Sequence, residues 1–126
     1  MNNGEIEMLS YHITYDNTEA IINVVYRPAN VPSVTFMNSL KTEISSQPSN
    51  IRKIVVGDFN LDQLLQTNKD LVTRYAREMS LIQKVDYSTH IRGGIIDLVL
   101  DSEPTGTFDW IPSAFSDHYC IFYDVH

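Results

Sequence analysis

Acidic, amide and imidazole side chains end or interrupt apolar segments at three places in the sequence. Asp58 and Asn60 follow an apolar run in KIVVGDFNLDQ, Asp97 lies inside IIDLVL, and Asp117 with His118 precedes YCIFY. A partly buried carboxylate is costly unless it meets a cation or hydrogen-bond donors. We therefore expect the three groups to converge at one end of a sheet and to share partners, namely a divalent metal ion and a histidine.

Asp97 is the sharpest of these cases, because apolar residues flank it on both sides. In a strand it shares a face with Ile95 and Val99. A hydrogen bond from an imidazole would compensate the burial of the carboxylate and would keep the ring oriented.

Periodicity predicts the elements that position these groups. Strands are expected at 7–15 and 20–26, joined by a turn at 16–18, and then at 51–56, 81–85, 95–100 and at the end of 116–125. One helix is predicted after a cap at Ser33, with Phe36, Leu40 and Ile44 on one face. A second is predicted after a cap near Thr67 or Asn68, with Leu71, Tyr75 and Met79 on one face. Residues 101–109 are predicted to form a loop. The pattern favours an α/β fold with helices packed on a mixed sheet, whose central strand is 51–56.

Composition sets limits on the class of protein. The chain has 126 residues, 43% of them hydrophobic, which suits one domain with a packed core. No apolar stretch approaches the roughly 20 residues of a membrane span, no secretory signal is visible, and Cys120 is the only cysteine. These features fit an intracellular protein without membrane partners, although they do not distinguish the nucleus from the cytoplasm.

The charge balance argues against one mode of nucleic-acid binding. Sixteen acidic residues outnumber nine basic ones, giving a net charge of −7. Proteins that bind DNA through many phosphates normally have a basic face. A site in which a metal ion supplies the positive charge stays open.

Three motifs in this order, VVGDFN, RGGIIDLVL and SDHYCIFYDV, resemble the endonuclease/exonuclease/phosphatase superfamily, the DNase I-like proteins. With VVYRP at 24–28 upstream, the chain is most similar to the endonuclease domains that accompany retrotransposon reverse transcriptases. The resemblance implies that residues 1–126 form the C-terminal portion of such a domain, a partial four-layer α/β sandwich.

The resemblance also implies a reaction, phosphodiester hydrolysis by in-line attack of water, with DNA as the expected partner. Asp58 would activate or orient the water, and Asn60, on the same side of an extended segment, would bind phosphoryl oxygens. Asp97 would orient His118, which stabilises charge growing on phosphorus. The remaining implied roles are those of Asp117, which would help to hold Mg²⁺ or Mn²⁺, and Tyr26, which would donate to the phosphate.

Simpler roles stay open for several of these residues. Asp58 is compatible with an ordinary turn, Asn60 with a cap, and Tyr26 with a core position. Two histidines, His12 and His90, match no motif and are expected to be structural or exposed. Arg92 could reach a phosphate, but an ordinary loop arginine is the simpler interpretation.

The chain departs from the family in length. Members contain a second half that supplies an asparagine and a principal metal-ligand glutamate, and no residue here matches either motif. Metal binding is therefore expected to be weak, and one sheet face should be uncovered and apolar. Self-association or pairing with a separate N-terminal half would follow. Two alternatives to the nuclease are a catalytically inactive binding or dimerising module and a phosphatase acting on lipid or inositol phosphates.

Overall fold

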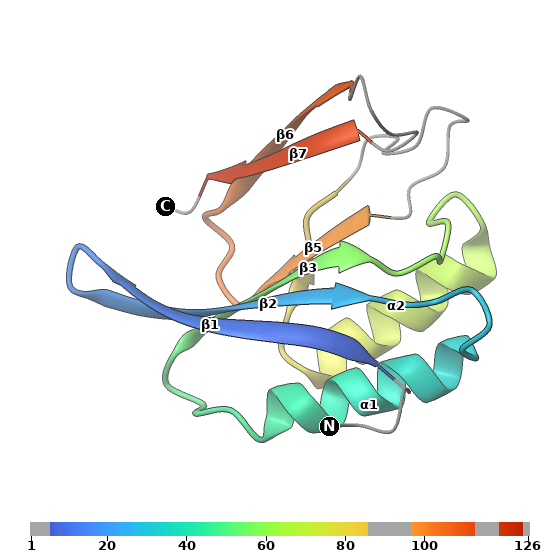
Figure 1. Ribbon diagram of the computed structural model, residues 1–126, viewed down its shortest axis with the longest axis horizontal. Helices are drawn as coiled ribbons and strands as arrows, with labels where there is room; N and C mark the ends of the chain where they lie inside the picture. Colours follow the sequence, from blue (N-terminus) through green and yellow to red (C-terminus); the bar gives the residue numbers. More distant parts are fainter. Residues whose placement is uncertain (1–5, 86–96, 113–118, 125–126) are drawn as a thin grey trace.

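The computed structural model describes residues 6–85, 97–112 and 119–124. In chain order its elements are β1 (Glu7–Tyr15), β2 (Thr18–Tyr26), α1 (Ser33–Ser45), β3 (Arg52–Asp58), α2 (Gln66–Glu78), β4 (Ile82–Gln83), β5 (Asp97–Asp101), β6 (Thr107–Pro112) and β7 (Tyr119–Asp124). Five strands form a mixed sheet in the order β1-β2-β3-β5-β4, and β6 and β7 form a separate sheet. Both helices cover the same face of the five-stranded sheet (Figure 1).

The strand order follows from the connections. A tight turn at Asp16 and Asn17, both with positive φ, joins β1 to β2 as an antiparallel hairpin. The β2 and β3 strands are parallel, so the chain must cross over between them, and α1 makes this crossover. β3 then lies between β2 and β5, as its apolar sequence predicted, with β5 antiparallel to it.

The helices and the inner sheet face share one core. Its helical members are Phe36, Met37, Leu40 and Ile44 from α1 and Val72, Tyr75 and Ala76 from α2. They pack with strand residues of β2, β3 and β5 that include Val25, Val55, Leu98 and Leu100. The predicted α/β class, with helices on one face of a mixed sheet, is confirmed.

Three local predictions are wrong. Ser33 is the first residue of α1 and not its cap, because Pro32 holds the cap position without a side-chain hydrogen bond. Similarly, α2 begins at Gln66, before the predicted cap at Thr67 or Asn68, and Leu65 precedes it. The predicted loop at 101–109 overlaps β6, which forms by pairing with β7 in a second sheet. Turn-forming residues dominate 101–106, so the sequence pattern there predicts a loop and gives no signal for β6, which follows.

A buried ion pair fastens β3 to β5. The Arg52 side chain donates to both carboxylate oxygens of Asp101, Nη2 to Oδ2 at 2.6 Å and Nε to Oδ1 at 3.0 Å. Both side chains are almost completely buried, so the bidentate geometry is needed to offset their loss of hydration.

None of the helices in the described ranges has the length and apolar content that a membrane span needs.

Candidate active site

Three of the predicted site residues lie side by side on adjacent strands. Tyr26 ends β2, Asp58 ends β3 and Asp97 begins β5. Tyr26 is the register partner of Asp58, and Asp58 is the register partner of Asp97. Register partners on neighbouring strands point to the same face, so all three side chains project from one rim, on the face away from the helices.

The carboxylates of Asp58 and Asp97 place two like charges close together. Asp58 and Asp97 are directly opposite in an antiparallel pair, a position in which Cβ atoms are about 4.5–5.5 Å apart. Like charges at this spacing destabilise the sheet unless protons, donors or a cation compensate them. The rim is therefore suited to a cationic or proton-sharing partner.

Contacts of Gly57, Asp58 and Phe59 fix the conformation of the turn that follows β3. Gly57 has φ +152° and sits against β2, where an added Cβ would lie 1.8 Å from the carbonyl oxygen of Val25. Asp58 accepts a hydrogen bond from the backbone N–H of Asn60 at 2.8 Å, which closes a local turn. Phe59 is fully buried and packs edge-to-face on Phe36 of α1, with ring centroids 5.4 Å apart. The GDFN motif therefore fixes the direction of the Asp58 side chain.

Arg27 holds this turn from the end of β2. Its buried guanidinium donates to the carbonyl oxygens of Phe59 at 2.6 Å and Asn60 at 2.7 Å, and to that of Val31. Its backbone N–H donates to the carbonyl oxygen of Asp58 at 2.8 Å. Burial lowers the pKa of Arg27, while the nearby negative charge of Asp58 opposes that effect. The sequence analysis missed this role, although an arginine directly after a strand in VVYRP was the available signal.

The prediction for Asn60 requires correction. It assumed an extended segment after Asp58, but β3 ends at Asp58 and Asn60 has φ +50°, in the left-handed region. The Asn60 side-chain amide donates through Nδ2 to the backbone oxygen of Arg27 at 2.7 Å. Asn60 thus closes a reciprocal clamp with Arg27, and its predicted role toward phosphoryl oxygens stays a prediction.

This clamp can be tested by stability measurements. Asn60→Ala should lower the free energy of unfolding by about 2–3 kcal/mol, because it loses one hydrogen bond and forces alanine into the left-handed region. Asn60→Gly tolerates that backbone and should cost only about 1 kcal/mol. Urea denaturation followed by circular dichroism measures both. Asn17→Ala is the control, since Asn17 has φ +63° in an exposed turn. If Asn60→Ala costs no more than Asn17→Ala, the clamp contributes nothing.

Among the remaining predicted residues, the structure describes Tyr26 and His12 but not the others. Tyr26 is 45% exposed, so the alternative of a core tyrosine is wrong. His12 is exposed, as predicted, and its Nε2 lies 3.2 Å from Oε1 of Glu19. Asp117, His118, His90 and Arg92 lie outside the described residues. The predicted contact of Asp97 with His118 therefore stays a prediction.

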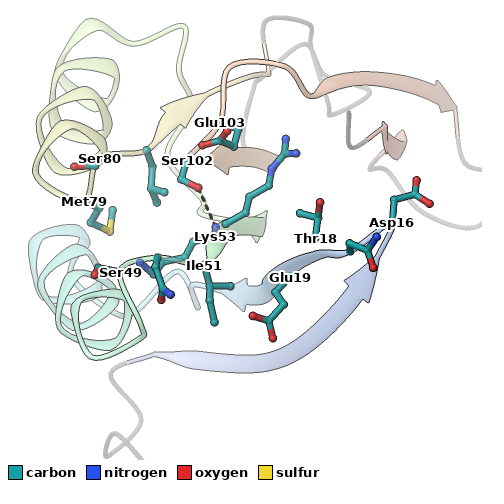
Figure 2. A pocket seen from close by; sticks show the side chains of 14 residues that line it. Asp16, Thr18, Glu19, Ser49, Ile51, Lys53, Met79, Ser80, Ser102 and Glu103 are labelled. Carbon is teal, nitrogen blue, oxygen red and sulfur yellow. Dashed lines mark hydrogen bonds between the residues drawn. The ribbon is translucent and has the colours of Figure 1, made fainter.

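A large hollow lies at the opposite end of the sheet (Figure 2). It has a volume of about 940 Å³ and lies beside the β1–β2 turn, the start of β3 and the segment after α2. Asp16, Glu19 and Glu103 line it together with Lys53, whose backbone N–H is bonded to Ser102. Arg52 also lines the hollow but is paired with Asp101, so three carboxylates lie around one remaining cation, Lys53, and do not favour a phosphate. The hollow therefore differs from the rim in both place and chemistry.

The rim fits part of a magnesium site. Carboxylate oxygens are the protein ligands that Mg²⁺ prefers, and it commonly takes one or two of them with water in the remaining positions. Within residues 6–85, 97–112 and 119–124, no group of three or more His, Cys, Asp or Glu side chains is arranged to hold a metal. Asp58, at the tip of β3, matches this preference and is the carboxylate of the described rim that could serve as one such ligand.

Comparison with known proteins identifies the fold. No family model and no curated protein sequence matches the chain. Among solved structures, an endonuclease/exonuclease/phosphatase family protein from Leptotrichia buccalis superposes with a TM-score of 0.74 at 14% identity, and the match covers 94% of this chain and 53% of that one. The endonuclease domain of TRAS1, a telomere-specific non-LTR retrotransposon, gives 0.72 at 14% identity, covering 96% and 69%.

A mannosyl-6-phosphatase from Bacteroides thetaiotaomicron also matches, with a TM-score of 0.61 at 14% identity over 86% of this chain and 52% of that one. At these identities the likeness establishes the fold, and it confirms the DNase I-like resemblance at that level. The chain spans about half the length of most solved structures that it matches.

Proposed function

We propose that this chain carries the catalytic rim of a metal-dependent phosphodiesterase that hydrolyses nucleic-acid backbones. One observation carries the proposal: Asp58 and Asp97 are opposed at the tips of β3 and β5, with Tyr26 beside them on β2. An endonuclease domain, a phosphatase and an endonuclease/exonuclease/phosphatase family protein share this fold, which supports hydrolysis of a phosphoester. The endonuclease domain of the retrotransposon TRAS1 supports a nucleic-acid substrate in particular.

In this mechanism Asp58 orients a water molecule and accepts its proton as the oxygen attacks phosphorus in line with the leaving oxygen. Its own orientation is fixed by the turn that Arg27 and Asn60 hold. Tyr26, exposed at the neighbouring strand tip, donates its hydroxyl proton to a phosphoryl oxygen. Both groups act on one face of the sheet, so a single phosphate can contact them together.

Asp97 is assigned a positioning role toward His118, whose imidazolium stabilises negative charge that develops on the phosphoryl oxygens. Asp117 and Asp58 are the residues that would hold Mg²⁺. When bound, the ion would supply positive charge to the leaving oxygen. The buried Arg27 guanidinium adds a fixed positive charge close to Asp58.

The direct test is cleavage of supercoiled plasmid DNA. With Mg²⁺ we expect conversion to the nicked form, and no conversion with excess chelator or in the His118→Ala variant. His12→Ala is the matched control, because His12 is an exposed histidine paired with Glu19 and should be dispensable. Nicking that is equal in wild type and His118→Ala would identify a contaminant, and no nicking by wild type would contradict the proposal.

A phosphatase is the second candidate. A mannosyl-6-phosphatase shares the fold, and the net charge of −7 is unfavourable for binding long polyanions. Hydrolysis of a phosphomonoester such as p-nitrophenyl phosphate, with intact plasmid in the same buffer, would favour this candidate over the nuclease.

A further inference from the structure

The sheet face away from the helices is buried at Val99 on β5 and exposed at Leu9 on β1. Register places Leu9, Val24, Val56 and Val99 in one row across β1, β2, β3 and β5. Val99 is only 1% exposed, but Val24 is 41% and Leu9 62% exposed. Tyr11, at 52%, lies on the same face. The apolar face is therefore buried over β5 and at Ala20 near the start of β2, and open to solvent at Leu9 and Tyr11 of β1 and at Val24 of β2.

Two edges accompany this open face. β6 and β7 form a two-stranded ribbon, which lies on the side of the main sheet opposite the helices (Figure 1). Isolated two-stranded ribbons are marginally stable. β1 is nine residues long and, among the described strands, pairs only with β2. It contains neither Lys nor Pro, the residues that usually protect an edge strand from pairing.

We propose that a second copy of this chain covers the open face in a two-fold dimer. Consider a two-fold axis parallel to the strands that passes above β1 and β2. It stacks the open faces of two copies, and sheets packed in this way lie about 10 Å apart. The helices of both copies then face outward, in four layers of helix, sheet, sheet and helix.

The same rotation places the β6–β7 ribbon of each copy beside the edge strand β1 of the other copy. Each ribbon occupies the layer of the partner's sheet, because it already lies on the open side of its own sheet. The side-to-side offset between copies brings each ribbon next to β1 of the partner. One arrangement thus covers both apolar faces and gives β1 a neighbouring strand.

The chemistry of the face favours a second copy over a different partner. On the β1–β2 part of this face, the residues include Glu7, Leu9, Tyr11, Ile13, Thr18, Ala20, Ile22, Val24 and Tyr26. Only Glu7, at one end, is charged. A two-fold interface brings the same patch together from both sides, and an uncharged patch can do so without burying an unpaired charge. The proposal concerns assembly and does not rest on the proposed hydrolysis.

Sedimentation velocity over a concentration series tests the dimer directly. We expect a species of about twice the chain mass of 14.4 kDa. Tyr11→Glu and Val24→Glu place a carboxylate inside the interface, so each should raise the dimer dissociation constant at least about 100-fold. Val34→Glu and Leu64→Glu are the controls, because both residues are similarly exposed but lie off this face. Circular dichroism verifies that every variant is folded.

Amide hydrogen exchange adds a readout specific to this arrangement. Exchange of the β1 amides should slow as the concentration of wild-type protein rises, and should not slow in Tyr11→Glu. A wild-type monomer at all concentrations would overturn the proposal. A dimer that Val34→Glu weakens as strongly as Val24→Glu, or that leaves β1 exchange unchanged, would overturn it as well.

Discussion

Replacing Asp58 by asparagine should lower the rate of plasmid nicking by about 10²–10⁴-fold, the usual contribution of a positioned general base. Asparagine keeps an oxygen that can accept the hydrogen bond from the Asn60 N–H, so the turn should persist and only the basic, metal-binding carboxylate is lost. Asp97→Asn should reduce the rate by a similar factor, because an amide oxygen orients an imidazolium less strongly than a carboxylate does.

Asp62→Asn is a closely matched control for both variants. Asp62 lies in the same loop, and its Oδ1 accepts a hydrogen bond from the backbone N–H of Leu64 at 3.0 Å, as Asp58 does from Asn60. It lies beyond the end of β3 and is not part of the rim. Single-turnover rates at saturating Mg²⁺ give the comparison. Equal rates in Asp58→Asn and Asp62→Asn would remove Asp58 from the mechanism.

Replacing Gly57 by alanine should have the largest effect on stability. The new Cβ would lie 1.8 Å from the carbonyl oxygen and 2.7 Å from the carbonyl carbon of Val25, so β2 and β3 must separate. The backbone φ of +152° is also one that side chains rarely adopt. We expect a loss of more than about 3 kcal/mol, a large fraction of the 5–15 kcal/mol that stabilises a typical domain.

Guanidinium denaturation followed by circular dichroism measures this loss. Val56→Ala, at the adjacent and half-buried position of β3, is the control and should cost only roughly 1 kcal/mol. A Gly57→Ala protein as stable as Val56→Ala would show that the two strands are not held at the described separation.

The sequence predicted the fold where a single element carries its own pattern. Alternation identified β1, the apolar run after a turn identified β2, and apolar residues at a spacing of four identified α1 and α2. β6 was missed because it exists through pairing with β7, and its own first residue follows a run of turn formers. The predicted helix starts were misplaced because Pro32 and Leu65 occupy the cap positions and make no side-chain hydrogen bond there. The caps expected at Ser33 and near Thr67 are therefore not formed.

The candidate site was predictable to the same extent. Asp58 was expected at a strand end and Asp97 inside the strand 95–100; β5 instead begins at Asp97, and the direct register of the two residues places them at one rim. The geometry of Asn60 was not predictable from spacing, because a buried arginine 33 residues earlier sets the backbone after Asp58. Local patterns do not report contacts of this range.

The contacts of the Arg27 guanidinium have a consequence for how the turn can change over evolutionary time. All three of its described acceptors are main-chain carbonyl oxygens, at Val31, Phe59 and Asn60. Every residue type presents that oxygen, so these guanidinium hydrogen bonds do not themselves depend on which side chains follow, although the side chain of Asn60 adds its own hydrogen bond to Arg27. Side chains at the rim can therefore change while the main-chain frame of the turn is retained, provided that the arginine itself persists.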